Sequence, residues 1–387
     1  MHYAARSDFG PQATGYGSAL QAARANGTLL DLTVSNPSRC GFHFPETLLP
    51  PLSRPESLTY DPHPLGMRRA REAVADMYRE GAGVEIAPEH ILLTGSTSEA
   101  YSYLLRLLGE PGDAVLVPSP SYPLFDLLAR LHDVERNTYP LVYHDGWQID
   151  PASLDAAVTE RTRALIVIHP NNPTGHFCSA ADRKALLQCA RRHGLPLIVD
   201  EVFLEYPVEG DPARSFVVQE DDEPVLTFVL GGLSKLLCLP QMKLAWTVVR
   251  GAEGDVAEAM HRLEIIADTF LSVGTPPQLA LPDWLAAGQG IRQQVTDRVR
   301  SNLAWLDGAL VGTVVSRLTV EAGWTAVLRV PAHEPDEDLA TRLLQEHDVA
   351  VHPGSLYGFA ARGWLVVSLL TPQETFAMGI ARLLQTF

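Results

Sequence analysis

The stretch VLTFVLGGLSKLLCLP, residues 225–240, carries the pattern that decides the fold. Its apolar run, in which Thr227 is the one polar residue, ends in two glycines, which is typical of a strand covered on both faces of a parallel sheet. Lys235 follows directly, in an otherwise apolar loop. Burial lowers the pKa of a lysine, so this position is costly unless the amine is used or its charge is removed. From this segment alone, a lysine that buries its stem and keeps its amine in water is an equally good interpretation.

Similar apolar runs alternate with helical periodicity from about residue 68 to 250. This alternation predicts an α/β fold with a mostly parallel sheet covered by helices. The expected strands are 91–94, 114–117, 165–169, 197–199, 226–230 and 244–249, and the expected helices are 68–80, 98–108, 124–131 and 180–193.

The C-terminal third follows another pattern, which predicts a separate α+β lobe. A long polar helix near 291–310 precedes strands at 326–330, 349–352 and 364–369 and a last helix over 372–384. The first 45 or so residues read as an irregular arm. We therefore expect an N-terminal arm with part of the small domain over 1–45, a large ligand-binding domain over 46–290, and a C-terminal small domain over 291–387.

Charge and composition exclude several classes of protein. Subtracting 46 acidic from 30 basic residues gives a net charge of −16, which argues against a nucleic-acid partner. No stretch of about 18 consecutive apolar residues occurs, and the first residues lack the pattern of a secretory signal, so we expect neither membrane association nor secretion. The four cysteines form no CxxC pair. We expect reduced thiols, no metal site and a cytoplasmic location.

Chemistry that needs an amine has few candidates in this chain, because only Lys184, Lys235 and Lys243 are lysines among the 30 basic residues. Lys184 lies among arginines on a predicted helix, where a solvated side chain is the simplest interpretation. Lys235 lies in the apolar loop described above, and Lys243 follows that loop.

Four further loops follow predicted strands and carry polar side chains. HPNNPTG (169–175) presents Asn172, LPLIVDEVF (195–203) ends its strand at Asp200, LLTGSTSEA (92–100) opens a helix with Ser96 and Thr97, and PSPSYPLF (118–125) presents Tyr122. Ligands of open α/β sheets bind at the carboxyl ends of the strands. Backbone N–H groups at a helix N-terminus hold phosphate. Together with the Lys235 segment, these loops supply a phosphate-binding helix end, a ring to stack on, an amide, an acid and an amine. This is the set of groups that pyridoxal phosphate needs.

The motifs YDPHPLG, TGSTSEA, PSPSYP, NNPTG, DEVF, LSK and PxxK occur in an order that resembles the class I/II aminotransferases, the fold-type I pyridoxal-phosphate enzymes. The resemblance covers nearly the whole chain. It implies an aspartate-aminotransferase-like fold, with a seven-stranded type of sheet in the large domain and a smaller α+β domain. It also implies a homodimer with shared active sites.

The resemblance implies a role for each motif residue. Lys235 would form the Schiff base with the cofactor and move the proton of the substrate's α-carbon. Asp200 would pair with the pyridinium nitrogen and Asn172 with the ring hydroxyl. The remaining cofactor contacts would come from Ser96, Thr97, Tyr122, Phe203, Ser234, Lys243 and, toward the neighbouring subunit's phosphate, Tyr60.

The chain departs from the family near the cofactor. Phe203 stands where the family has a tyrosine that donates to the ring hydroxyl, and Gly232 replaces a phosphate-binding serine. In the family's P-G-x-R-x-G stretch the arginine is Lys243, which can act as a point charge but loses the forked geometry of a guanidinium.

A fourth departure concerns the substrate. The family's G-x-x-R-x-S stretch binds the α-carboxylate through its arginine, and here GWLVVS puts Val366 at that position. Either the substrate lacks this carboxylate or another cation binds it. The candidates are Arg39, in the segment SNPSRCGF with Asn36, and secondarily Arg362.

We therefore expect a pyridoxal-phosphate enzyme that acts on an amino acid or small primary amine, in first place an aminotransferase. The alternative is a lyase, a β/γ-replacement enzyme or a cyclising enzyme of specialised metabolism. A non-catalytic cofactor-binding regulator is a third hypothesis, against which Lys235 and Asp200 argue.

Overall fold

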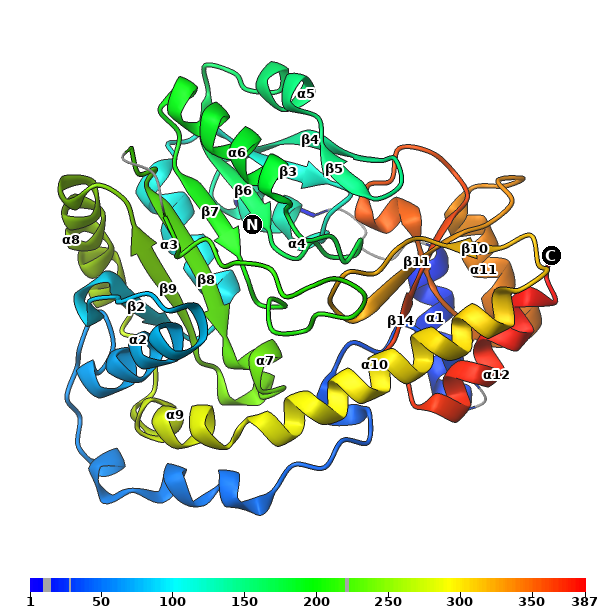
Figure 1. Ribbon diagram of the computed structural model, residues 1–387, viewed down its shortest axis with the longest axis horizontal. Coiled ribbons are helices and arrows are strands. Elements are labelled where there is room, and N and C mark those ends of the chain that lie inside the picture. Colours follow the sequence, from blue (N-terminus) through cyan, green and yellow to red (C-terminus); the bar gives the residue numbers. More distant parts are fainter. Residues whose placement is uncertain (10–14, 28, 220–222) are drawn as a thin grey trace.

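An eight-stranded sheet forms the centre of the larger part of the molecule (Figure 1). The computed structural model describes residues 1–9, 15–27, 29–219 and 223–387. In spatial order the strands are β2 (Ile91–Thr94), β9 (Ala245–Arg250), β8 (Thr227–Gly232), β7 (Leu197–Asp200), β6 (Thr162–Ile168), β3 (Ala114–Ser119), β4 (Glu135–Tyr143) and β5 (Trp147–Ile149). The neighbours from β8 to β4 pair in parallel, whereas β9 and β5 run against their neighbours. The sheet is thus mostly parallel, as expected, but it has eight strands and not the seven that the resemblance implied, because β5 folds back on β4 as an additional edge strand.

Helices cover both faces of this sheet, which explains why its strands read as bare apolar runs. In β6, for example, Ile166 and Ile168 pack with α3 (Thr97–Leu108), α4 (Leu124–Leu131) and α8 (Glu253–Phe270). Leu165 and Val167, one residue out of step, join the core on the opposite face. The other helices of this part are α2 (Arg68–Ala82), α5 (Pro151–Ala156), α6 (Ala180–His193), α7 (Leu233–Leu236) and α9 (Thr275–Ala287).

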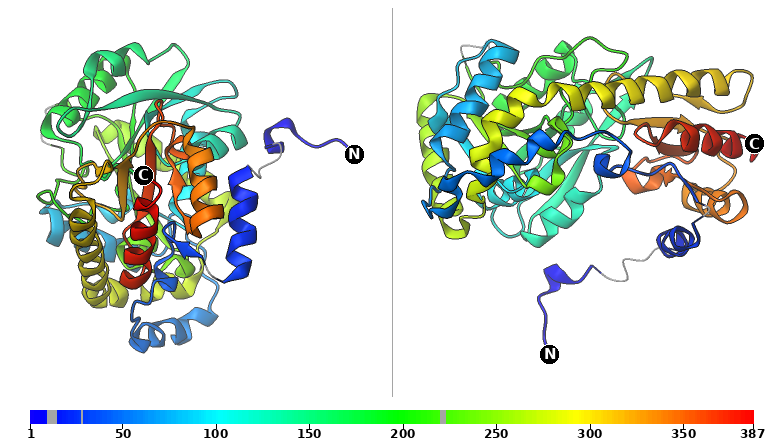
Figure 2. Two further views of the ribbon diagram at one scale, coloured as in Figure 1. Left: turned by 90° about the vertical axis from the view of Figure 1, so that its right-hand side faces the viewer. Right: turned by 90° about the horizontal axis from the view of Figure 1, so that it is seen from below.

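A second, antiparallel sheet forms the centre of the smaller part (Figures 1 and 2). Its order is β10 (Ser316–Arg317), β11 (Thr325–Arg329), β14 (Trp364–Ser368) and β13 (His352–Pro353). The long helix α10 (Gln289–Leu310) runs from the end of α9 into this part, where α11 (Asp336–His347) and α12 (Gln373–Leu384) also lie. The N-terminal segment joins it, because α1 (Gly15–Asn26) packs on α11 and β1 (Leu30–Asp31) pairs with β12 (Val349–Ala350).

The expected elements are present, with ends that differ by a few residues, except in two places. The N-terminal segment is not irregular as expected, since residues 15–26 form helix α1. Tyr16 of this helix is buried, and its phenol donates a hydrogen bond to the Val351 carbonyl of the small domain. The expected strand over 349–352 is two short strands, β12 and β13, which pair with different partners. Residues 10–14 and 28 of the expected arm and 220–222 of the expected large domain lie outside the described residues. The expected domain boundaries remain predictions.

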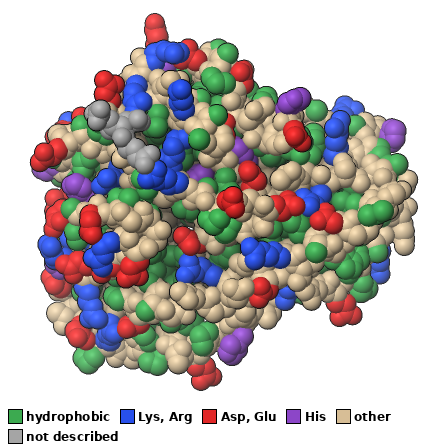
Figure 3. Space-filling view, viewed as in Figure 1, with side chains coloured by type: hydrophobic (Ala, Val, Ile, Leu, Met, Phe, Trp, Pro, Cys, Tyr) green, Lys and Arg blue, Asp and Glu red, His purple; other side chains and the backbone are tan. Residues whose placement is uncertain are grey.

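Two surface properties complete the description. Acidic and basic side chains are interspersed on the face shown in Figure 3. Within the described ranges, none of the helices has both the length and the apolar character needed to cross a membrane.

Candidate active site

A cavity of about 510 Å³ lies where the carboxyl ends of the parallel strands meet the small sheet. Most of the site residues expected from the sequence line this one cavity. They are Ser96, Thr97, Tyr122, Asn172, Asp200, Phe203, Ser234, Lys235 and Lys243. The fold brings them together because most lie at or just after the carboxyl end of a parallel strand, and Lys243 lies just before the antiparallel β9, which begins at the same edge.

Lys235 lies on the short helix α7, directly after β8. Its Nζ atom lies 5.4 Å from the centre of the Phe203 ring and 5.1 Å from that of Trp324. Its backbone carbonyl accepts a hydrogen bond of 2.7 Å from the phenol of Tyr206. Burial lowers the pKa of the Lys235 amine, and Cys238 and Asp200 oppose this shift only in part. The site therefore holds an amine that loses its proton more readily than a surface lysine does.

Asp200, the last residue of β7, supplies the acid of the cavity. Its carboxylate accepts hydrogen bonds from the Val202 backbone at 3.2 Å and from the Tyr101 phenol at 3.3 Å. Burial nevertheless raises its pKa to about 6, against the effects of these donors and of Lys235. A buried carboxylate of this kind gains strongly from a cationic partner.

Asn172 lies in the loop after β6, and its Oδ1 atom is buried without a hydrogen-bond partner among the described residues. The loop is held against the small domain, where Thr325 donates a hydrogen bond of 2.8 Å to the Pro173 carbonyl. At Gly175, with φ +69°, a Cβ atom would lie 2.6 Å from the Ala322 carbonyl oxygen, so only glycine fits there. An unpartnered buried amide oxygen is rare and marks a position where a ligand can supply the missing donor.

The N-terminus of α3 forms another part of the cavity wall. Ser96 caps the helix by accepting a hydrogen bond of 3.2 Å from the Glu99 backbone, and Ser96, Thr97 and Ser98 line the cavity at this helix end. Lys243 lies across from it, on a backbone with φ +51°. A helix N-terminus beside a lysine attracts a phosphate through both the helix dipole and the amine.

The other expected site residues lie elsewhere. Tyr60 is 78% exposed and belongs to a separate surface depression. Asn36 and Arg39 are exposed on the short 3-10 helix Pro37–Arg39 and are not among the residues that line the cavity. Arg362 is exposed as well, whereas Val366 is fully buried in β14. The roles assigned to Tyr60, Asn36 and Arg39 remain predictions.

Four residues of the site carried no signal that could be recognised in the sequence. Tyr101 binds Asp200, Tyr206 binds the Lys235 backbone, and Trp324 and His352 line the cavity from the small domain. Tyr101 and Tyr206 look like ordinary core aromatics, and the two others come from a part of the chain far from the strand-end motifs.

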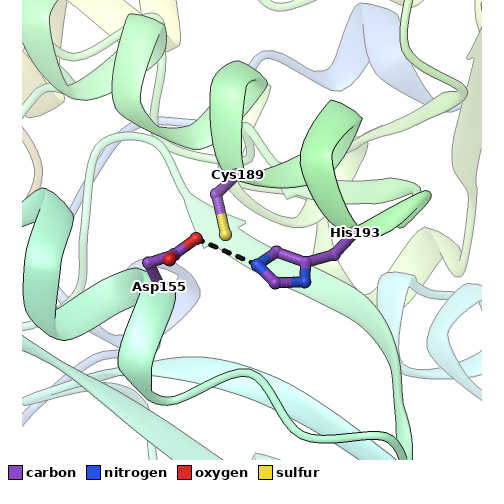
Figure 4. A group of neighbouring side chains, drawn as sticks. All are labelled: Asp155, Cys189 and His193. Carbon is purple, nitrogen blue, oxygen red and sulfur yellow. Dashed lines mark hydrogen bonds and ion pairs between the residues drawn. The ribbon is translucent and has the colours of Figure 1, made fainter.

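A group of possible metal ligands lies away from the cavity. Asp155, Cys189 and His193 point toward one another from α5 and α6, with ligand atoms within 4.8 Å (Figure 4). The carboxylate of Asp155 already binds His193 at 2.9 Å and Arg192 at 2.7 Å. Burial raises the pKa of the Cys189 thiol to about 11, so the thiolate that a metal needs is disfavoured. The ion pair between Asp155 and Arg192 explains why an acid lies here, with no need for a metal ion.

The cavity fits pyridoxal phosphate in the chemistry of its lining. It offers a half-buried amine, a half-buried carboxylate, an unpartnered amide oxygen and a helix N-terminus with a lysine beside it. These are the groups required for a covalent anchor, a partner for a ring nitrogen, a partner for a ring hydroxyl and a phosphate site.

Comparison with known proteins agrees with this geometry. Residues 55–383 match the family described as aminotransferase class I and II. An alanine aminotransferase of Mycobacterium tuberculosis is 28% identical over 369 residues, which cover 92% of this chain and 84% of that protein. Nicotianamine aminotransferase 1 of Oryza sativa subsp. japonica is 24% identical over 83% of this chain, which spans 66% of that relative's length.

Solved structures show the same fold. An alanine aminotransferase from Pyrococcus furiosus superposes with a TM-score of 0.89 at 22% identity, over 100% of this chain and 99% of that one. A Thermus thermophilus aspartate aminotransferase variant gives a TM-score of 0.86 at 23% identity, over the full length of both chains. With the family matched over most of its length, the chain belongs to the class I and II aminotransferases, a family of pyridoxal-phosphate-dependent enzymes.

Proposed function

We propose that this chain binds pyridoxal phosphate through Lys235 and transfers an amino group from a small primary amine or amino acid to a carbonyl acceptor. One observation carries the proposal: a half-buried amine with a lowered pKa and a half-buried carboxylate line the same cavity as the N-terminus of α3. In this assignment Asp200 faces the ring nitrogen, Asn172 the ring hydroxyl and Tyr122 the ring face. Ser96, Thr97, Ser234 and Lys243 face the phosphate.

Each residue around the cofactor has its own role in the proposed reaction. When bound, the cofactor withdraws electrons from the substrate carbon that carries the amino group. Lys235 accepts the proton from that carbon and returns it to another atom, for which a lowered pKa is favourable because more of the amine is neutral. Asp200 keeps a proton on the ring nitrogen, and Tyr101 and Val202 orient its two carboxylate oxygens. Trp324 and Phe203 pack around the Lys235 amine.

The proposal extends to a homodimer in which Tyr60 reaches the phosphate of the neighbouring subunit. Its support is the exposed position of Tyr60, which leaves the side chain outside the cavity of its own chain. A cytoplasmic location stays a prediction from the sequence.

Elimination or replacement at the β or γ carbon is the second candidate, favoured by Val366 at the family's carboxylate-binding position. The two reactions differ in their products. Transfer forms a new amine only when a carbonyl acceptor is added. Elimination releases ammonia or a side-chain group without an acceptor.

The decisive experiment is removal of the amine by Lys235→Ala. The purified protein should carry the visible absorbance of covalently bound cofactor, and the variant should lose it together with amino transfer. Lys184→Ala is the matched control, because Lys184 lies on α6 outside the cavity. An absorbance that survives Lys235→Ala would disprove the assignment.

A further inference from the structure

The small domain forms the end of the cavity that would hold the substrate. Two neighbouring residues lie where the family has its carboxylate-binding cation. Val366 in β14 and His352 in β13 lie directly opposite each other in an antiparallel ladder. Directly opposite residues share one face of the sheet, with Cβ atoms about 5 Å apart. Val366 is fully buried, and His352 lines the cavity. At the position where the resemblance implies a carboxylate-binding arginine, the chain therefore presents a valine and an imidazole.

The cavity lining contains no arginine within the described ranges, and its only lysines are Lys235 and Lys243. One arginine, Arg24, touches a lining residue, since it donates a hydrogen bond of 3.1 Å to the hydroxyl of Thr33. Its guanidinium also binds the Asp31 carboxylate at 2.9 and 3.0 Å, so its charge is balanced by an acid. Among the described residues of this lining and their bonded neighbours, a carboxylate would find no unpaired guanidinium.

Three of the hydroxyl groups at this end are also engaged. Thr325 donates to the Pro173 carbonyl at 2.8 Å, Ser368 donates to the Val34 carbonyl, and Thr33 donates to the Asp31 carboxylate. A hydroxyl has a single hydrogen to donate. In these arrangements the three hydroxyls have none left for a substrate carboxylate.

His352 does not supply the missing charge. Its side chain is half-buried, and desolvation lowers its pKa, while Asp31 and the Thr33 backbone oppose the shift only in part. The imidazole is thus neutral near neutral pH.

The depression around Tyr60, the residue that the resemblance assigns to the neighbouring subunit's site, adds no cation of this kind. The depression around Tyr60 is lined by residues of 60–66, 93, 103 and 267–278, none of which is an arginine or lysine. Its charged groups, Asp61 and His63, lie 3.0 Å apart and bind each other. The residues around Tyr60 would therefore bring neither a guanidinium nor an ammonium group to a shared site.

The remaining lining on this side is mostly apolar and aromatic, and its polar groups, such as the Ser35 hydroxyl and the unpartnered Trp324 indole N–H, are uncharged. Trp324, Tyr357 and Leu356 face the cavity from the small domain, and Leu124, Phe125 and Leu128 face it from the segment after β3. An uncharged apolar or aromatic group gains from burial here, whereas an ionised carboxylate without a partner pays its desolvation.

We propose that the preferred substrate is a primary amine that carries an apolar or aromatic body and no carboxylate on the carbon next to nitrogen. This inference rests on the proposed amino-transfer function and specifies its substrate class. In the overall reaction the C–N bond of the amine breaks and its carbon is oxidised to a carbonyl. An aldehyde or ketone acceptor is reduced to an amine as its new C–N bond forms. The proton taken from the donor carbon is matched by one given to the acceptor carbon.

The test compares matched donors on the holoenzyme. Phenethylamine and phenylalanine differ only by the carboxylate, as do isoamylamine and leucine. Conversion of the bound cofactor to its amine form, followed in single turnover by loss of visible absorbance, gives a second-order rate constant for each donor. We expect each amine to react at least tenfold faster than its amino acid. An amino acid that reacts as fast as its amine, or faster, overturns the inference and leaves amino transfer intact.

A gain of charge provides the second arm. His352→Arg places a guanidinium beside Val366 and should shift the ratio of rate constants toward the amino acid by at least tenfold. His333→Arg makes the same exchange on the exposed surface of the small domain and should leave the ratio unchanged. If His352→Arg fails to fold, the comparison of donors on the natural protein still decides.

Two other outcomes point to different errors. If amino acids are preferred and Arg39→Ala removes the preference, Arg39 binds the carboxylate and the inference is wrong. If no donor of either pair converts the cofactor, although Lys235→Ala abolishes its absorbance, amino transfer itself is overturned along with its substrate class.

Discussion

Gly232 and Ala245 lie directly opposite each other in the β8–β9 ladder, and a Cβ atom at position 232 would lie 2.9 Å from the Cβ of Ala245. The sequence differs from the family at both positions. The resemblance implies a serine at 232, and at 245 it implies the last glycine of the P-G-x-R-x-G stretch. The structure relates the two departures: the methyl group at 245 occupies the space that a side chain at 232 would need. Both residues line the cavity near Lys243.

Gly232→Ser should lower the free energy of unfolding by about 1–3 kcal/mol, the usual effect of overpacking. Adding Ala245→Gly should recover most of this loss. The double variant should also bind the cofactor several-fold more tightly, because its new hydroxyl can donate to the phosphate and a net hydrogen bond contributes about 1 kcal/mol. Urea denaturation and cofactor titration measure both effects. A single variant as stable as the natural protein would contradict the steric argument.

Lys243 combines a predicted role toward phosphate with a left-handed backbone, φ +51°. Lys243→Ala should weaken cofactor binding roughly 10- to 100-fold, as expected for one charge-assisted contact. Lys243→Arg should keep most of the affinity. Lys243→Gly should lose as much affinity as the alanine variant, yet be about 1 kcal/mol more stable than it, because glycine adopts positive φ without steric cost. Cofactor titration and thermal unfolding test the two properties separately, and Lys184→Ala serves as the charge control.

Tyr206 fixes the segment that carries Lys235, through its hydrogen bond to the Lys235 carbonyl at 2.7 Å. Tyr206→Phe removes this donor, although the carbonyl keeps a hydrogen bond of 3.2 Å from the Cys238 backbone, and should lower the free energy of unfolding by about 0.5–1.5 kcal/mol. We also expect slower amino transfer with little change in phosphate affinity, because the Lys235 amine is displaced while Lys243 and α3 are not. A variant with unchanged single-turnover rates would show that α7 needs no such support.

His176 connects the two parts of the molecule. It lies 3.1 Å from the Glu321 carboxylate of the small domain through Nδ1, and its Nε2 atom lies 3.2 Å from Asp182 on α6. The second contact falls outside hydrogen-bond geometry for Nε2, so its contribution is mainly electrostatic. Burial acts to lower the pKa of His176, but the two carboxylates outweigh burial and the net shift is upward.

A raised pKa in the folded state makes the contribution of His176 dependent on pH. Stabilisation by the charged ring is complete below the unfolded-state pKa of about 6.5 and is lost as pH rises through the higher folded-state pKa. The difference in unfolding free energy between the natural protein and His176→Asn should therefore be larger at acidic than at alkaline pH. Denaturation of both proteins across this range tests the sign, and His333→Asn on the surface controls for a histidine without carboxylate partners.

The strand-end residues could be predicted because each signal is local. Asp200 ends an apolar run, Asn172 follows one, and Lys235 follows another, so a parallel sheet brings the three side chains to one edge whatever the packing around it. Residues such as Trp324 and His352 could not be found in this way. They reach the cavity from strands near the C-terminus, and only the packing of the small domain on the large one places them there.

The N-terminal segment shows the same limit. Its helix α1 has a weak apolar pattern, and what stabilises it is contact with α11, more than 300 residues away along the chain. Likewise, nothing in the sequence around residues 232 and 245 shows that a side chain at 232 would need the space that the Ala245 methyl group occupies.

By itself, the sequence determined the family, the parallel sheet and the residues that offer an amine, an acid and an amide, because periodicity and strand-end motifs are properties of short segments. It also showed that the expected arginine is Val366. Only the tertiary structure decided what surrounds that position: His352 in the opposite strand, hydroxyls that already donate within the protein, and Arg24 paired with Asp31. Charge and hydrogen-bond capacity at a substrate site depend on every group that packs there, and such groups meet only when distant segments fold together.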